Sequence, residues 1–223
     1  MNYRRLRFFA PPFFAPPFLA PPRFAPPFFA PARFAPPFRA ELALCAGAWT
    51  PDLLDGDDLT LQVERQVMHW FNPARDAQWL RIDRCPIAMT EYAPDRIFYF
   101  VPDAGAGVKA AIHHEGEITH PDRVRRDVDP HEVGPVRDLL SRYIPSANGA
   151  LRGSATCLYT DTPDGHFLIT PHGRDRDVLV VSACSGHGFK FASAIGEAVA
   201  DLLMGLSRPD LAAFGRERLT PAA

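Results

Sequence analysis

The sequence predicts a mixed α/β (α+β) fold in which strands outnumber helices. From Ala40 onward the chain has the composition of an ordinary globular protein, and hydrophobic residues make up 47% of the whole sequence. In several short segments apolar and polar side chains alternate, which is the period of half-buried strands. Two longer segments repeat their apolar residues every three to four positions, which is typical of helices.

The elements follow in order along the chain. Leu59, Leu61 and Val63 alternate with polar residues and so indicate a strand. Strands are predicted over nine segments: 42–45, 59–64, 66–71, 86–92, 96–101, 107–113, 154–160, 165–170 and 178–183. A helix is expected near 135–143, because Pro135 suits a first helical position. A second helix is expected over 189–204, where Gly205 is placed to end it.

Residues 9–38 consist of six tandem pentapeptides rich in Phe, Ala and Pro. Paired prolines fix φ and remove backbone donors, so neither a helix interior nor a central strand can form there. We predict that residues 1–40 are disordered or extended as polyproline II. Two interpretations stay open: a Pro-rich ligand for a partner domain, and a translated tandem DNA repeat joined in frame to a gene fragment.

The charge balance argues against several classes of function. Residues 1–40 carry six arginines and no acidic residue, whereas residues 41–223 carry 18 basic and 26 acidic residues. With a net charge of −2 for the whole chain, we expect neither nucleic-acid binding nor attraction to an anionic membrane. No apolar run reaches the roughly 18 residues of a membrane helix.

The four cysteines, Cys45, Cys85, Cys157 and Cys184, form no C-x-x-C pair. We therefore expect no structural metal site. So few cysteines in a chain of 223 residues also argue against a disulfide framework. The expectation is a cytoplasmic protein with reduced thiols.

Residues 178–190 predict a buried strand, a small-residue turn and a helix. The strand ends at Cys184, and the turn Ser185–Gly188 leads into the helix. Glycines let a backbone approach a ligand closely, and a helix N-terminus favours a negatively charged group. Many strand–helix turns are rich in glycine, so a ligand-binding turn and a plain connection both stay open.

The chain holds 22 arginines and only two lysines, Lys109 and Lys190. A surface cation can change to arginine at little cost, whereas a lysine is retained where a compact, pKa-tunable ammonium is needed. Lys190 follows the glycine turn, and Lys109 sits on a predicted strand. The alternative interpretation is that both are ordinary surface lysines.

Four blocks carry a family resemblance. They are Ala46-Gly47-Ala48-Trp49, Gly107-Val-Lys-Ala-Ala-Ile-His113, Cys157-Leu-Tyr-Thr-Asp-Thr-Pro-Asp-Gly-His-Phe167 and Ser185-Gly-His-Gly-Phe-Lys-Phe191. In order and spacing the chain resembles the sarcosine oxidase and N-methyl-L-tryptophan oxidase family, within the D-amino-acid-oxidase-like flavoenzymes. The resemblance implies a mixed substrate-domain sheet over 59–150. It also implies pieces of an FAD-binding domain over 41–58 and, as its C-terminal return, over 151–223.

This resemblance implies an FAD-dependent oxidase of secondary, N-methyl amino acids such as sarcosine, with O2 reduced to hydrogen peroxide. Cys157 matches the cysteine that forms a thioether to the flavin; its alternative role is that of a small buried hydrophobe. Lys109 matches the residue that activates oxygen, because a fixed positive charge stabilises superoxide. Lys190 matches a residue that binds the substrate carboxylate beside the flavin.

Other matching positions are implied at the substrate or the flavin. Tyr99, Tyr159 and His113 match residues of the catalytic cavity, and both tyrosines are also expected to contact the substrate. Tyr99 lies in an apolar segment and has a second interpretation as a core residue. The further positions implied at the cofactor are Ala46, Gly47, Gly186, His187 and Gly188, and Gly186 is also implied at the substrate.

The sequence departs from the family in one respect. The N-terminal G-x-G-x-x-G turn that holds the FAD pyrophosphate has no counterpart here. We therefore expect the dinucleotide-binding half to be missing, with the repeat in its place. Three further hypotheses stay open: an inactive fragment, a half-enzyme completed by a separate FAD-domain chain, and an interaction protein that binds a partner through the repeat.

Overall fold

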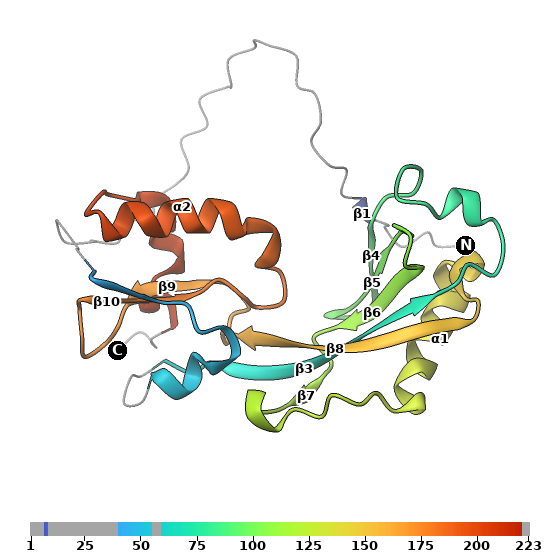
Figure 1. The fold of residues 1–223 in the computed structure, drawn as a ribbon, viewed down its shortest axis with the longest axis horizontal. Coiled ribbons are helices and arrows are strands. Elements are labelled where there is room, and N and C mark those ends of the chain that lie inside the picture. Colours follow the sequence, from blue (N-terminus) through green and yellow to red (C-terminus); the bar gives the residue numbers. More distant parts are fainter. Residues whose placement is uncertain (1–6, 9–39, 55–58, 220–223) are drawn as a thin grey trace, which may run out of the picture. The chain divides into compact units, whose positions relative to one another are not determined.

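The structure is a computed structural model that describes residues 7–8, 40–54 and 59–219 (Figure 1). The segment 1–40 was predicted to be disordered or extended; except for residues 7–8 and Ala40, it lies outside these residues. The described chain divides into two compact units. The first contains Arg65–Glu117, Arg123–Cys157 and residues 7–8; the second contains Ile118–Asp122, residues 158–219 and the described part of 40–64.

A seven-stranded sheet forms the centre of the first unit, and three of its strands, β3, β7 and β8, continue past the boundary of that unit. The strands are β1 (Arg7–Phe8), β3 (Gln62–Phe71), β4 (Ala88–Ala93), β5 (Arg96–Val101), β6 (Val108–His113), β7 (Glu117–Ile118) and β8 (Leu151–Asp161). Their order is β1-β4-β5-β6-β3-β7, and β8 also pairs with β3. The β4–β5–β6 meander and the β3–β6 pair are antiparallel.

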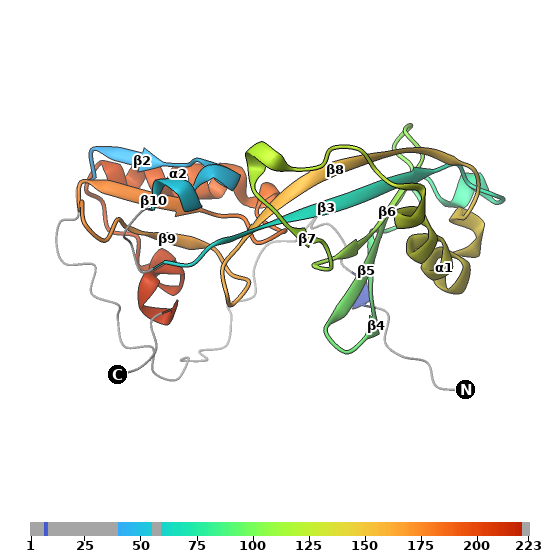
Figure 2. The same ribbon diagram turned by 90° about the horizontal axis from the view of Figure 1, so that it is seen from below.

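Helix α1 (Val133–Tyr143) packs on one face of this sheet (Figure 2). Leu140 of the helix is fully buried against Phe98 and Phe100 of β5. The helix begins two residues earlier than predicted. A capping box between Asp129 and Glu132 starts a 3-10 turn that runs directly into it.

Strand β3 corrects one sequence prediction. The segments 59–64 and 66–71 were expected as two strands, but a single strand covers 62–71. Its interior position in the sheet buries Glu64 and Arg65, which are 6% and 2% exposed. The sequence pattern had placed Glu64 on a solvent-facing side. The buried Arg65 side chain has an ion-pair partner, because Glu132 Oε1 lies 2.5 Å from its Nη1.

The second unit holds a three-stranded sheet in the order β2-β10-β9, and helix α2 packs on one face of it (Figure 1). Its elements are β2 (Leu42–Leu44), β9 (Leu168–Pro171), β10 (Val178–Ser182) and α2 (Ala192–Leu203). Strand β10 pairs parallel with β2 and antiparallel with β9. Leu179 and Val181 pack with α2, whereas Val180 packs with Leu54 and Leu61 on the other face.

Short connections complete the described fold. The 3-10 helices are Gly47–Trp49, Pro51–Leu53, Ala77–Trp79, Pro121–Arg123, Pro130–Glu132, Pro145–Ala147, Phe189–Phe191, Pro209–Phe214 and Arg216–Leu219. The predicted last helix therefore splits into a 3-10 turn and α2, and Gly205 follows it at φ +78°. Among the residues that the structure describes, no helix combines the length and apolar character needed to cross a membrane. The predicted α/β class is confirmed.

Candidate active site

Strands β5 and β6 bring Tyr99, Lys109 and His113 together on one face of the first unit's sheet. Tyr99 pairs with Ala111, and Lys109 and His113 lie two residues to either side of Ala111. The Lys109 Nζ is 5.9 Å from the centre of the Tyr99 ring, and the Tyr99 and His113 rings meet edge-on at 6.2 Å. A cation beside an aromatic face is a favourable arrangement.

This Lys109 face is the face opposite α1. Lys109 pairs with Trp70 of β3, so both side chains point to the same side. Their neighbours His69 and Phe71 point the other way and are 1% and 0% exposed. Lys109, Trp70 and Tyr99 are only half-buried. The strand alternation therefore separates a packed face from a face with accessible functional groups.

Cys157 lies on β8 in the same unit and is half-buried. Burial raises the pKa of its thiol, and the positive charge of Lys109 acts in the opposite, lowering direction. The thiol is therefore close enough to Lys109 to experience its charge. Tyr159, two residues further along β8, points to the same side of the strand as Cys157.

In the second unit the parallel strands β2 and β10 have their carboxyl ends at the same end of the sheet. Leu44 pairs with Val180, so the turns that follow the two strands start near each other. Ala46 and Gly47 follow β2, and Ser185–Gly188 follows β10. A Cβ added at Gly47, which has φ +55°, would meet no atom within 4 Å, so this turn borders open space. In open α/β sheets such an edge is where ligands bind.

The Ser185–Gly188 turn is held in a specific backbone shape. Ser185 is fully buried at φ +46°, and Gly186 has φ +72°. A Cβ on Gly188 would lie 1.6 Å from the carbonyl oxygen of Ala183, so only glycine fits this position. The His187 ring stacks on Phe167 with ring centres 4.7 Å apart.

Lys190 lies just beyond this turn, in the 3-10 helix Phe189–Phe191, and its side chain is exposed. Its Nζ is 5.2 Å from the centre of the Phe191 ring.

The structure groups the predicted residues in two sets, one per unit. The first unit carries Tyr99, Lys109, His113 and Cys157, and the second carries Ala46, Gly47, Tyr159, Gly186, His187, Gly188 and Lys190.

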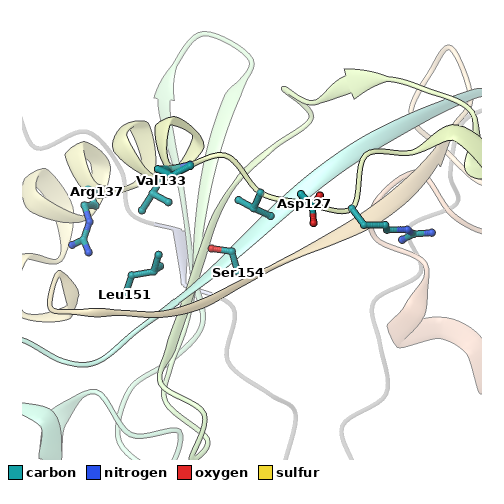
Figure 3. A pocket seen from close by; sticks show the side chains of 8 residues that line it. Asp127, Val133, Arg137, Leu151 and Ser154 are labelled. Atoms are coloured by element: carbon teal, nitrogen blue, oxygen red, sulfur yellow. The ribbon is translucent and has the colours of Figure 1, made fainter.

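A cavity of about 590 Å³ lies elsewhere, on the α1 side of the first unit's sheet (Figure 3). Val133 and Arg137 of α1 and Leu151 and Ser154 of β8 line it, together with Arg126, Asp127, Val128 and Pro130. Ser154 Oγ is 2.7 Å from Nδ1 of His69, and burial lowers the pKa of this histidine. None of the predicted site residues lines this cavity, because they point to the opposite face or belong to the other unit.

Sequence reasoning missed one charged residue of the second unit, Arg218. Arg218 donates from Nε to Asp164 Oδ2 at 2.6 Å, inside the block that carries the family resemblance. The two residues are 54 positions apart, and no spacing rule connects them. An arginine near the C-terminus gives no signal of its own in a chain with 22 arginines.

Comparison with known families defines the class of protein. Residues 33–202 match the family described as FAD dependent oxidoreductase. The chain belongs to this family.

Two curated proteins are similar to this chain over most of its length. The chain is 38% identical over 187 residues to the monomeric sarcosine oxidase of Streptomyces avermitilis, which covers 82% of this chain and 49% of that protein. It is 33% identical over 182 residues to the N-methyl-L-tryptophan oxidase of Yersinia pestis, covering 80% and 47%. The chain spans about half the length of the curated relatives it matches.

Solved structures share the fold. A thermally stable mutant of fructosyl peptide oxidase aligns with a TM-score of 0.63 at 22% identity, over 81% of this chain and 45% of that one. The amino acid oxidase NikD aligns with a TM-score of 0.57 at 21% identity, over 80% and 47%. At these identities the likeness concerns the fold alone.

Proposed function

We propose that this chain forms part of an FAD-dependent amine oxidase that oxidises the C–N bond of a secondary, N-methyl amino acid such as sarcosine and reduces O2 to hydrogen peroxide. Family membership and the names of the two curated relatives support this proposal. The observation that carries it is the position of Lys109, half-buried opposite α1 beside Tyr99, with a charge that reaches Cys157.

Each unit, taken by itself, offers groups that suit the ring end of a flavin. The positive charge of Lys109 acts to lower the pKa of the Cys157 thiol. A lower pKa favours the thiolate, the reactive form that a covalent link requires. Gly47 and Gly186 adopt positive φ in the two turns at the carboxyl edge of the parallel strands. The printed residues contain no G-x-G-x-x-G, the turn that holds a dinucleotide pyrophosphate. We propose FAD as the cofactor and Cys157 as its attachment point.

FAD, when bound, supplies the acceptor for the hydride equivalent that leaves the carbon beside nitrogen. Lys109 holds a positive charge where negative charge develops on oxygen, so it lowers the cost of reducing O2. Tyr99 and His113 flank this ammonium and shape the wall against which the amino acid lies. In the second unit, Lys190 is proposed to bind the substrate carboxylate.

The remaining positions keep the roles that the resemblance gave them. Tyr159 and Gly186 are proposed to contact the substrate, and Ala46, Gly47, His187 and Gly188 to line the flavin. The segments 41–58 and 151–223 are proposed as FAD-domain pieces around a substrate domain over 59–150. We also propose a cytoplasmic location, based on four free cysteines in the described chain.

A half-enzyme completed by a separate chain with a dinucleotide-binding fold is the second candidate. The alignment covers 49% of one curated relative and 47% of the other, and the chain has no pyrophosphate-binding turn. On this hypothesis the residues described above contribute only the second half of the site.

The absorbance spectrum of the purified chain, before and after incubation with FAD, tests both candidates. A flavin band that survives acid precipitation in the wild type and in Cys85→Ser, but not in Cys157→Ser, would support covalent attachment at Cys157. Sarcosine-dependent peroxide release would then test turnover. A colourless chain even with added FAD would contradict an oxidase formed by this chain alone. Colour that appears only with a second chain would support the half-enzyme.

A further inference from the structure

The turn between β8 and β9, residues 162–167, holds the buried start of the Ser185–Gly188 turn. The Ser185 hydroxyl donates to the carbonyl oxygen of His166 at 2.8 Å. It also accepts from the Thr162 amide at 3.3 Å. Ser185 is 0% exposed and sits at a positive φ that non-glycine residues rarely adopt. These contacts therefore fix a backbone conformation that Ser185 does not favour by itself.

The same turn fixes His187. Its Nε2 lies 3.1 Å from the carbonyl oxygen of Gly165, so this nitrogen carries the ring proton and donates. Its ring stacks on Phe167 at an interplanar angle of 25°. Residues 162–167 thus hold the Ser185–Gly188 turn at two points, one at the backbone bend and one at the imidazole.

Asp164 organises the supporting turn from inside. Its Oδ1 accepts from the Thr162 hydroxyl at 2.8 Å and from the His166 amide at 3.2 Å. Burial would raise the pKa of Asp164, but hydrogen bonds from Arg218, Thr162 and the His166 amide outweigh this effect and lower the pKa to about 2. The carboxylate is therefore charged at neutral pH and acts as a fixed acceptor.

Arg218 ties the C-terminal 3-10 helix to this arrangement. Its Nε donates to Asp164 at 2.6 Å, and its Nη2 donates to the carbonyl oxygen of Phe167 at 2.5 Å. Its Nη1 donates to the carbonyl oxygen of Gly215 at 2.7 Å. The side chain is 20% exposed. A planar guanidinium can hold three partners at fixed angles, which a lysine cannot do.

We propose that Arg218 and Asp164 are positioning residues that set the conformation of the Ser185–Gly188 turn through residues 162–167. The importance of that turn rests on the proposed function, which places it beside the flavin. Arg218 lies beyond residue 202, where the family match ends. The contacts that define its role all lie within the second unit.

Amide hydrogen exchange in the full chain without flavin tests this proposal. The Ser185 amide donates to Thr160 at 3.0 Å and the His187 amide donates to Cys184 at 3.2 Å, so both report on the shape of the turn. We expect Arg218→Gln to speed exchange at both amides by about tenfold or more relative to α2. The His187 ring resonances should shift as well.

Arg208→Gln is the matched control. Arg208 is 23% exposed and bonds two carboxylates in the same unit, Asp201 at 2.8 Å and Asp210 at 2.7 Å. Its hydrogen bonds within the described chain go to these carboxylates and not to residues 162–167. It should leave the ratio of exchange rates unchanged. Equal effects of both variants, a uniform increase throughout the unit, or an unchanged turn in Arg218→Gln would overturn the proposal.

Asp164→Asn, which keeps the size of the side chain but removes its charge, gives the answer if Arg218→Gln does not fold. It should loosen the Ser185 and His187 amides in the same local way, and an unchanged turn would contradict the proposal. Flavin binding is not part of this readout. A chain that never binds FAD would contradict the proposed function but would leave the exchange result intact.

Discussion

Replacing Glu132 with glutamine would disturb the buried ion pair that fixes the chain before α1. The Arg65 side chain is 3% exposed, and its Nη1 and Nη2 lie 2.5 and 3.3 Å from the Glu132 carboxylate. Arg65 also donates to the carbonyl oxygens of Arg125 at 2.7 Å and Asp127 at 3.0 Å. Without the negative charge of Glu132, the buried Arg65 guanidinium is left with neutral acceptors such as these two carbonyl oxygens.

The size of the effect follows from the pKa of Glu132. Burial would raise this pKa, but hydrogen bonds from Arg65 and Arg125 outweigh that effect and lower it from 4.5 to about 2. Such a difference corresponds to about 3 kcal/mol, and water reduces it to about 1–2 kcal/mol because 25% of the side chain is exposed. The unpaired buried cation adds to this loss, so we expect Glu132→Gln to lower the free energy of unfolding by about 2–4 kcal/mol.

The pH dependence has a definite sign. Because the folded-state pKa is depressed, the stabilisation is complete above the ordinary value of 4.5 and is lost as the pH falls through about 2. Urea unfolding followed by tryptophan fluorescence should therefore show the gap between wild type and Glu132→Gln closing as the pH falls toward about 2. Other carboxylates titrate in both proteins and cancel in the difference.

An exposed ion pair provides the control. Arg81 and Asp83 are 2.9 Å apart, and their side chains are 64% and 55% exposed. Asp83→Asn should change the free energy of unfolding much less than Glu132→Gln does, because water screens an exposed pair. A loss in Glu132→Gln no larger than in this control, or a gap that stays constant as the pH falls, would refute the reasoning.

Three further measurements test the first unit. Gly107→Ala should lower the free energy of unfolding in urea by about 1–3 kcal/mol, because φ is +95° and a Cβ would lie 2.8 Å from a backbone oxygen of β3. Gly134→Ala in α1 is the control, because a Cβ there meets nothing within 4 Å. It should leave the free energy of unfolding unchanged or raise it by up to about 1 kcal/mol. Leu140→Ala, at a 0% exposed position, should cost about 2–5 kcal/mol, and a much smaller loss would argue against the packing of α1. Lys109→Met should raise the pKa of the Cys157 thiol, measured by the pH dependence of alkylation at that residue. An unchanged pKa would mean that the charge of Lys109 does not act on this thiol.

Local patterns predicted most elements of the fold because their causes are local. The segment 96–101 was predicted and forms β5 with the same bounds, since its buried Phe98 and Phe100 alternate with half-buried residues. Gly205 ends the last helix as expected, because glycine tolerates the positive φ found there. The two-residue strands β1 and β7 were not predicted, since two residues are too short to show a period.

Interactions between distant positions left no mark in the sequence. Arg65 and Glu132 are 67 positions apart, and an alternating pattern gives no reason for a buried arginine in the middle of β3. Arg218 reaches back 54 positions to Asp164. Composition alone singled out Lys109 and Lys190 but left open that both are ordinary surface lysines. Their roles at the site came only from the resemblance.

Gly107 gives the Gly-x-Lys spacing on β6 a physical reason. Its backbone approaches the Phe71 carbonyl so closely that a side chain does not fit, and its amide donates to Asp103 Oδ1 at 2.8 Å. The next residue, Val108, then pairs with Phe71 and faces α1. Because side chains alternate along a strand, Lys109 must point to the opposite face. A slip of one residue would bury this ammonium against the helix, so the register that completes the core also places the cation where the proposed chemistry needs it.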